Sequence, residues 1–127
     1  MLIKNHEDQL IYETIGGAME VYNHFGPGLL ESVYHKALFQ ELKIRGLPVQ
    51  SHVPTEIFYK GAYVSDDLKL DLLVDEELVV ELKAVERLQP VHFKQVRTYM
   101  KLLDKTAGLL INFDVADFKD GYKVIKR

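Results

Sequence analysis

The sequence predicts an α/β fold in which helices pack on a mixed β-sheet, in the order helix, helix, three strands, helix, strand. Three observations support it. Two amphipathic segments fill the first third of the chain, and short strand-like segments follow Pro48. A third amphipathic segment separates these strands from a last apolar one. Because helices stand before and after a strand meander, the sheet is expected to contain antiparallel and parallel pairs.

Length and composition indicate one soluble domain over residues 1–127. Hydrophobic residues make up 47% of the chain and charged residues 28%, the balance of a globular protein. The chain has no cysteine, which excludes a disulfide framework, thiolate metal sites and a cysteine nucleophile, and agrees with a cytoplasmic location. No apolar run is long enough to cross a bilayer, and the first residues lack the apolar core of a signal peptide, so no membrane partner is expected.

The three helices are expected over residues 7–25, 29–45 and 91–103, where apolar residues recur at helical spacing. Gly26-Pro27-Gly28 ends the first helix, since glycine suits the left-handed position after a helix and proline cannot continue it. Gly46 ends the second in the same way, and Pro90 precedes the third.

Four strands are expected to form the sheet, over residues 55–60, 68–74, 78–84 and 107–113. They are rich in β-branched, aromatic or leucine residues, and turn-forming residues separate them. An optional short strand over 122–125 follows the Asp120-Gly121 turn.

The hairpin over residues 68–84 places charged side chains together. If residues 75–77 form a three-residue loop, Val74 faces Leu78 and Asp71 stands directly opposite Glu81. Side chains alternate along a strand, so four charged residues are expected on one face: Lys69, Asp71, Glu81 and Lys83. The opposite, core-facing side then holds Leu70, Leu72, Val80 and Leu82.

Two opposed carboxylates repel each other unless something compensates their charge. A divalent cation does this most simply, and carboxylate oxygens suit Mg²⁺ or Mn²⁺. The alternative is a solvated face on which Asp71 and Glu81 pair with the two lysines, and a two-residue loop would separate the acids altogether.

Charge is distributed unevenly along the chain, whose formal net charge is -3. Residues 61–82 carry seven acids and one base, whereas residues 83–105 carry six bases and two acids. An acidic stretch beside a basic one suits a metal site next to a phosphate-binding surface, although solvated faces can carry such a pattern by chance. The overall charge argues against a protein coated in basic residues.

Other candidates are weaker when taken alone. Glu31 falls near the edge of the apolar arc of the second helix, so its side chain is expected to lean towards the core, and a first-turn carboxylate suits the helix dipole. Glu41 falls even nearer the centre of that arc, so the position does not separate a metal ligand from an ordinary acid. Gln95 and Tyr99 share a flank of the third helix. The five histidines show no zinc-binding spacing and are expected at the surface or as helix caps.

The motif Gly28-Leu29-Leu30-Glu31-Ser32-Val33-Tyr34 spells GxxExxY and follows a Gly-Pro dipeptide. With it the chain resembles the bacterial family named for that motif, over nearly its whole length. That family is similar to small members of the PD-(D/E)xK nuclease superfamily, whose restriction-endonuclease-like core is a mixed four-stranded sheet flanked by helices. Further segments carry the resemblance: residues 71–74, 80–86, 90–92 and 110–113.

The resemblance implies roles for particular residues. Asp71 matches the first acid of the superfamily motif, with Leu70 where the motif name has proline, and Glu81 with Lys83 matches the (D/E)xK half. Glu31 matches the helix-borne acid that completes the metal site in many members. Gln95 and Tyr99 match the QxxxY element of the exonuclease-like branch.

The implied function is metal-dependent hydrolysis of phosphodiester bonds. Asp71, Glu81 and Glu31 would hold one or two Mg²⁺ ions, with Mn²⁺ as a substitute, and Lys83 would position the attacking water, with Gln95 as a further catalytic residue. Contacts with nucleic acid, expected to be DNA, are assigned to Tyr34, Lys69, Arg87, Lys94, Arg97 and Tyr99. A homodimer or a protein partner stays open.

Two other functions compete with this one. A binding or regulatory module could keep the nuclease fold without catalysis inside a larger DNA-processing complex, and the small size of the chain favours it. The retained acid–acid–lysine set disfavours it. A glycosidase with paired carboxylates ranks lower, because the chain has no tryptophan and Lys83 would have no role.

Overall fold

The computed structural model describes residues 2–127 and contains a five-stranded mixed sheet with helices on both faces. The strand order follows the chain order, and within residues 2–127 only the β3–β4 pair is parallel. The α/β prediction is therefore confirmed, with one more strand than the four expected. The elements are α1 (His6–Phe25), α2 (Glu31–Ile44), β1 (Val49–Tyr59), β2 (Ala62–Val74), β3 (Leu78–Lys83), α3 (Pro90–Leu102), β4 (Ala107–Asn112), a 3₁₀ turn η1 (Phe118–Asp120) and β5 (Tyr122–Lys126).

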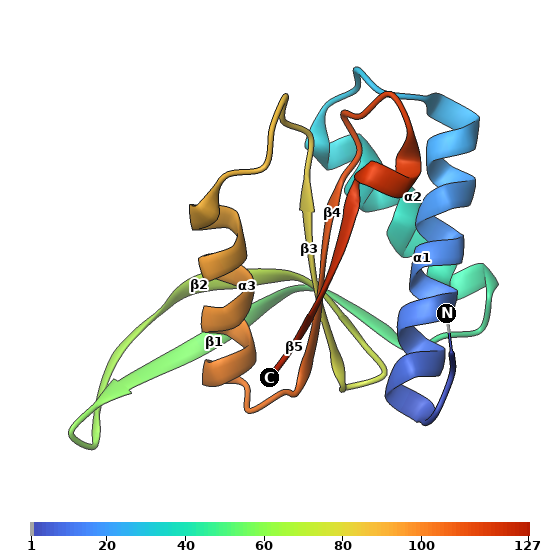
Figure 1. Cartoon of the computed structure of the whole chain (residues 1–127). Helices are drawn as coiled ribbons and strands as arrows, with labels where there is room; N and C mark the ends of the chain where they lie inside the picture. Colours follow the sequence, from blue (N-terminus) through green and yellow to red (C-terminus); the bar gives the residue numbers. More distant parts are fainter. Residues whose placement is uncertain (1) are drawn as a thin grey trace.

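The sheet separates two apolar cores. Helices α1 and α2 cover one face, and α3 covers the other as the crossover between β3 and β4 (Figure 1). Both central strands are buried on both faces, which explains why they read as almost continuous apolar runs. On β4, Gly108 lets α3 approach closely, since a Cβ there would lie 2.6 Å from Val96 Cγ1.

The β2–β3 hairpin has the predicted register. Val74 pairs with Leu78 and Leu72 with Val80, so residues 75–77 form the connecting loop. Asp75 and Glu76 have φ values of 49° and 60°, the left-handed region that a short hairpin loop requires. Asp71 and Glu81 consequently stand opposite each other, as expected.

The predicted alternation fails at Leu70. We expected Leu70 on the same face as Leu72, but Leu70 packs in the α3-side core and Leu72 in the α1/α2-side core. The strands change face here, and His52, opposite Asp71 on β1, has a φ of 52°. Beyond this point the β1–β2 hairpin projects from the rest of the sheet as an arm (Figure 1).

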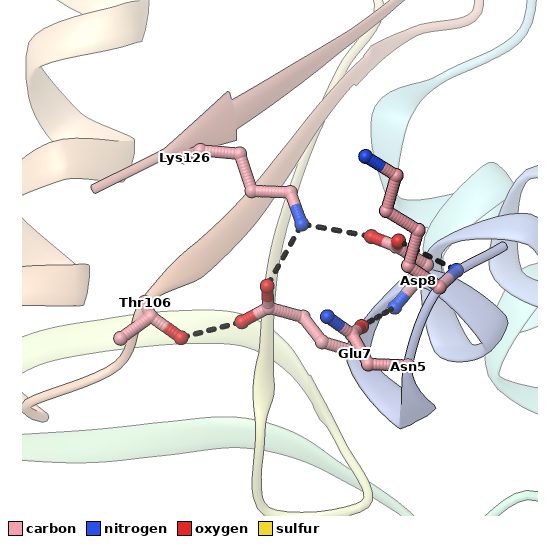
Figure 2. Close-up of polar contacts among 6 residues, drawn as sticks. Asn5, Glu7, Asp8, Thr106 and Lys126 are labelled. Atoms are coloured by element: carbon pink, nitrogen blue, oxygen red, sulfur yellow. Dashed lines mark hydrogen bonds and ion pairs between the residues drawn. The ribbon is translucent and has the colours of Figure 1, made fainter. Parts of the chain in front are cut away.

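The N-terminus of α1 is fastened to the C-terminal strand. Lys126 Nζ lies 2.8 Å from Glu7 Oε2 and 2.9 Å from Asp8 Oδ1, and the Thr106 hydroxyl donates to Glu7 (Figure 2). Asn5 caps the helix by accepting from the Asp8 backbone N–H. Segments about 120 residues apart in the chain are thus joined at one corner.

None of the helices within residues 2–127 combines the length and apolar character needed to span a bilayer.

Candidate active site

Asp71 and Glu81 lie where the β2–β3 ladder opens. Regular pairing ends at Leu72 and Val80, and carboxylates then replace backbone carbonyls as acceptors. The Asp71 N–H donates to Glu81 Oε1 over 2.9 Å, and the Leu82 N–H donates to Asp71 Oδ2 over 2.8 Å. These cross-strand bonds fix both side chains. The other oxygen of each carboxylate accepts no hydrogen bond from residues 2–127, so it is available to a ligand.

Glu81 is the buried member of this pair. Only 5% of its surface is exposed, whereas Asp71 is half-buried. Burial, followed by the charge of Asp71, raises the pKa of Glu81 to about 8. Without a cation the Glu81 carboxyl group is therefore mostly protonated at neutral pH. A bound divalent cation would offset both causes of the shift.

Lys83 and Glu31 complete the charged group around this pair. Lys83 is half-buried, lies two residues after Glu81 on β3, and its charge opposes the rise in the pKa of Glu81 and Glu31. Glu31 is the first residue of α2 and is exposed, so the expectation that it leans into the core is wrong. Partial loss of hydration and the charge of Asp71 raise the Glu31 pKa.

The oxygen donors of Asp71 and Glu81 fit a hard divalent cation. Mg²⁺ typically takes one or two protein carboxylates and keeps several waters. The three acids Glu31, Asp71 and Glu81 do not bring ligand atoms within 4.8 Å of one another. Within residues 2–127, only His6, Asp75 and Glu77 do so. Asp71 and Glu81 thus suit a divalent cation by their donor atoms, and the structure does not gather Glu31 with them into a three-ligand cluster.

A pocket of about 430 Å³ opens beside the pair on the α3 side; we call it the site pocket. The Tyr99 hydroxyl at its wall donates to the Lys69 carbonyl over 2.9 Å. Burial raises the pKa of Tyr99 to about 12, and the charges of Glu81 and Asp71 add to this, so the phenol stays neutral. The site pocket is lined by Leu68, Glu81, Lys83, Val91, Lys94, Gln95, Thr98 and Tyr99.

The four basic candidates for phosphate contacts are all exposed, but the structure does not gather them. Lys94 lines the site pocket. Arg87 lines a separate hollow beside His92, and Arg97 faces Lys126 and Arg127 at the far side of α3. Lys69 is not among the residues that line the site pocket, because β2 changes face after Leu70.

The structure gives Tyr34 a different role from the predicted contact with nucleic acid. Its side chain is fully buried, stacks on Phe113 with ring centroids 4.4 Å apart, and accepts from the Leu29 N–H. Its hydroxyl donates to the Gly26 carbonyl. Tyr34 therefore fastens the α1–α2 loop to the core and offers no surface to a substrate.

Asn112 is a supporting residue that the sequence prediction missed. It pairs with Lys83 across the parallel β3–β4 ladder and is 2% exposed. Its side chain accepts from the Val85 N–H over 3.0 Å and donates to the Val85 carbonyl over 2.8 Å. The chain leaving Lys83 is thereby held in place. An asparagine at the end of the apolar segment 107–113 is the signal that could have revealed it.

The predicted surface or capping role of the histidines is confirmed for His92 and wrong for His35. His92 caps α3, since its Nδ1 accepts from the Gln89 N–H, and this prediction is confirmed. His35 is 6% exposed, so its predicted surface or capping role is wrong. Its Nε2 lies 2.6 Å from Ser51 Oγ, and this polar partner makes burial possible.

A mixed sheet flanked by helices, with Asp71 opposite Glu81 and Lys83 two residues later, defines a restriction-endonuclease-like protein. The chain matches the family model of the PD-(D/E)XK nuclease superfamily over residues 8–125, and it belongs to that family. No curated protein and no solved structure matches the chain.

Proposed function

We propose that the protein is a metal-dependent nuclease that hydrolyses phosphodiester bonds of DNA, with Mg²⁺ as cofactor and Mn²⁺ as a substitute. The observation that carries this proposal is the buried Glu81 carboxylate fixed opposite Asp71, with Lys83 beside it. Membership of the nuclease superfamily supports it.

In this proposal Asp71 and Glu81 hold the metal, and Glu31 completes the site. When bound, Mg²⁺ would act as a Lewis acid, activating water and neutralising developing negative charge. Lys83 holds the attacking water and stabilises charge on the phosphoryl oxygens. The role assigned to Lys83 is to orient the attacking water rather than to accept a proton from it.

Residues of α3 form the opposite wall of the proposed site. Gln95 lines the site pocket with Glu81 and Lys83, and its amide can both donate to and accept from a water or a phosphate. Lys94 at the same wall provides a phosphate contact. Tyr99 supports the wall through the Lys69 carbonyl and the apolar part of its ring.

A cleavage assay tests this function. Labelled single- and double-stranded DNA and RNA are incubated with the protein in Mg²⁺, in Mn²⁺ and in chelator, beside Asp71→Ala. The proposal predicts cleavage of DNA that needs metal and is lost in the variant. If the folded wild-type protein binds Mn²⁺ but cleaves none of these substrates, a non-catalytic module acting with a protein partner becomes the better account.

A further inference from the structure

Strands β1 and β2 change face at the same place, next to the proposed metal site. On β2 the change lies between Leu70 and Leu72, so it is centred on Asp71. On β1, the register pairs Ser51 with Leu72 and Val53 with Leu70, which leaves His52 opposite Asp71. This pair does not join the regular ladder.

His52 has an unusual backbone for its position. Its φ of 52° lies in the left-handed region, which is unfavourable for a residue with a Cβ and favours glycine. Such strain clusters at functional sites when the surrounding structure enforces it. A turn does not account for it, because His52 lies within β1 rather than at its end.

The His52 side chain is held but accessible. Its ring stacks on the ring of His35, with centroids 4.3 Å apart and planes 7° apart. His35 is buried and anchored to Ser51 on the neighbouring position of β1. His52 itself is exposed, and its ring nitrogens make no hydrogen bond within residues 2–127. A fixed, accessible imidazole is thus presented at the surface.

The stacked pair lies beside the carboxylates. His35 is one helical turn after Glu31 on α2, so the two side chains share a face of that helix. Ser51, which His35 contacts, pairs with Leu72 next to Asp71 on β2. The exposed ring of His52 therefore stands on the α2 side of the site, across from the site pocket on the α3 side.

We propose that His52 is a substrate-binding residue whose ring N–H donates to a backbone phosphate next to the scissile one. This inference rests on the proposed nuclease function and extends it, since nucleic acid would then be held from both sides of the metal site. The left-handed backbone turns the His52 ring onto His35, and the stack limits its rotation. Phosphate contacts of this kind position the substrate without reading its sequence.

The test uses His52→Gly, which removes the ring and accepts the positive φ, and His52→Asn, which tolerates that φ and keeps a donor. The control is Glu76→Gly, since Glu76 is also exposed and has a φ of 60° in the hairpin loop away from the site. Cleavage of fluorescein-labelled DNA gives kcat and KM, anisotropy in Ca²⁺ gives the Kd for DNA, and titration with Mn²⁺ gives metal affinity.

The expected result for His52→Gly is about a tenfold rise in both KM and Kd, with kcat within about twofold and Mn²⁺ affinity and Tm not lowered. His52→Asn should lie between it and the wild type, and Glu76→Gly should match the wild type. Unchanged KM and Kd in His52→Gly would overturn the proposal, as would losses that follow Mn²⁺ affinity or Tm. A wild-type protein that neither binds nor cleaves DNA would overturn the nuclease function as well.

Discussion

At Glu81 the chain buries a carboxyl group on a strand whose other buried residues are apolar, and the cost of ionising it makes stability depend on pH. The folded-state pKa of about 8 lies above the ordinary 4.5, so the metal-free folded protein binds the extra proton between these values. The contribution of Glu81 to the free energy of unfolding is therefore most favourable below about pH 4.5. It declines as the pH rises from there through 8.

Glu81→Gln removes this dependence. In chelator, urea unfolding should give the variant and the wild type similar free energies of unfolding near pH 4.5. The variant should gain a few kcal/mol over the wild type at pH 8, since one pKa unit corresponds to about 1.4 kcal/mol. Glu31→Gln, at an exposed position, is the control and should change much less. Parallel pH profiles for Glu81→Gln and the wild type would show that Glu81 ionises normally.

Lys83→Ala should abolish cleavage without unfolding the protein. Loss of a charge-stabilising group of this kind lowers kcat by about 10²–10³. Lys83 is half-buried at a strand end, so Tm should change little, and Mn²⁺ should still bind at Asp71 and Glu81. Cleavage rates from quenched time courses measure this.

Lys69→Ala is the matched control for Lys83→Ala, because simple alternation would have put both lysines on one face. The structure moves Lys69 away from the site pocket, so its variant should keep most activity. Equal losses in the two variants would contradict the face change on β2.

Among the elements, the β2–β3 hairpin was predictable because its apolar residues and loop length fix the register. The face change on β2 was not predictable, because it occurs opposite a left-handed backbone at His52, which no local pattern requires of a histidine. The predicted register therefore brought Asp71 and Glu81 together, with Lys83 on the same strand as Glu81. The face change is the reason that Lys69 and Leu70 were placed on the wrong side. The burial of Tyr34 likewise depends on Phe113, far along the chain.

Asn112 holds the backbone that follows β3, through its side-chain hydrogen bonds with Val85. Replacing it with alanine leaves the Val85 N–H and carbonyl without their partners, which should cost about 1–3 kcal/mol of stability. Freeing the chain after Lys83 should also lower kcat, by up to about 10²-fold for a displacement near 1 Å. Urea unfolding and cleavage rates measure both. Asn23→Ala, at an exposed position on α1, should change neither. Full activity of Asn112→Ala would show that Lys83 is positioned without it.

For the whole molecule, the order of elements was predictable from periodicity, and β5 had the weakest sequence pattern because it has only 5 residues. Contacts between residues remote in sequence hold β5 in place. The Thr106 carbonyl accepts from the Arg127 N–H, and Lys126 joins Glu7 and Asp8 at the start of α1 (Figure 2). No local sequence pattern predicts these contacts.

Lys126→Ala should loosen the C-terminal strand rather than the site. A partly exposed ion pair near the surface contributes about 1 kcal/mol or less, so β5 amides should exchange up to about fivefold faster, and the difference should shrink at high salt. Lys123→Ala, on the same strand and without an ion pair in residues 2–127, is the control. Hydrogen exchange followed by NMR measures these rates. Equal exchange rates of the β5 amides in Lys126→Ala and Lys123→Ala would contradict the expectation.

The proposed metal site is tested most directly by calorimetric titration of the wild-type protein with Mn²⁺ at pH 7.5, beside Asp71→Ala and His6→Ala. Asp71→Ala is expected to abolish binding and His6→Ala to leave it unchanged, because the proposed site places the cation between Asp71 and Glu81. Binding that survives in Asp71→Ala and disappears in His6→Ala would place the ion at His6, Asp75 and Glu77, and would contradict a metal site at the opened hairpin.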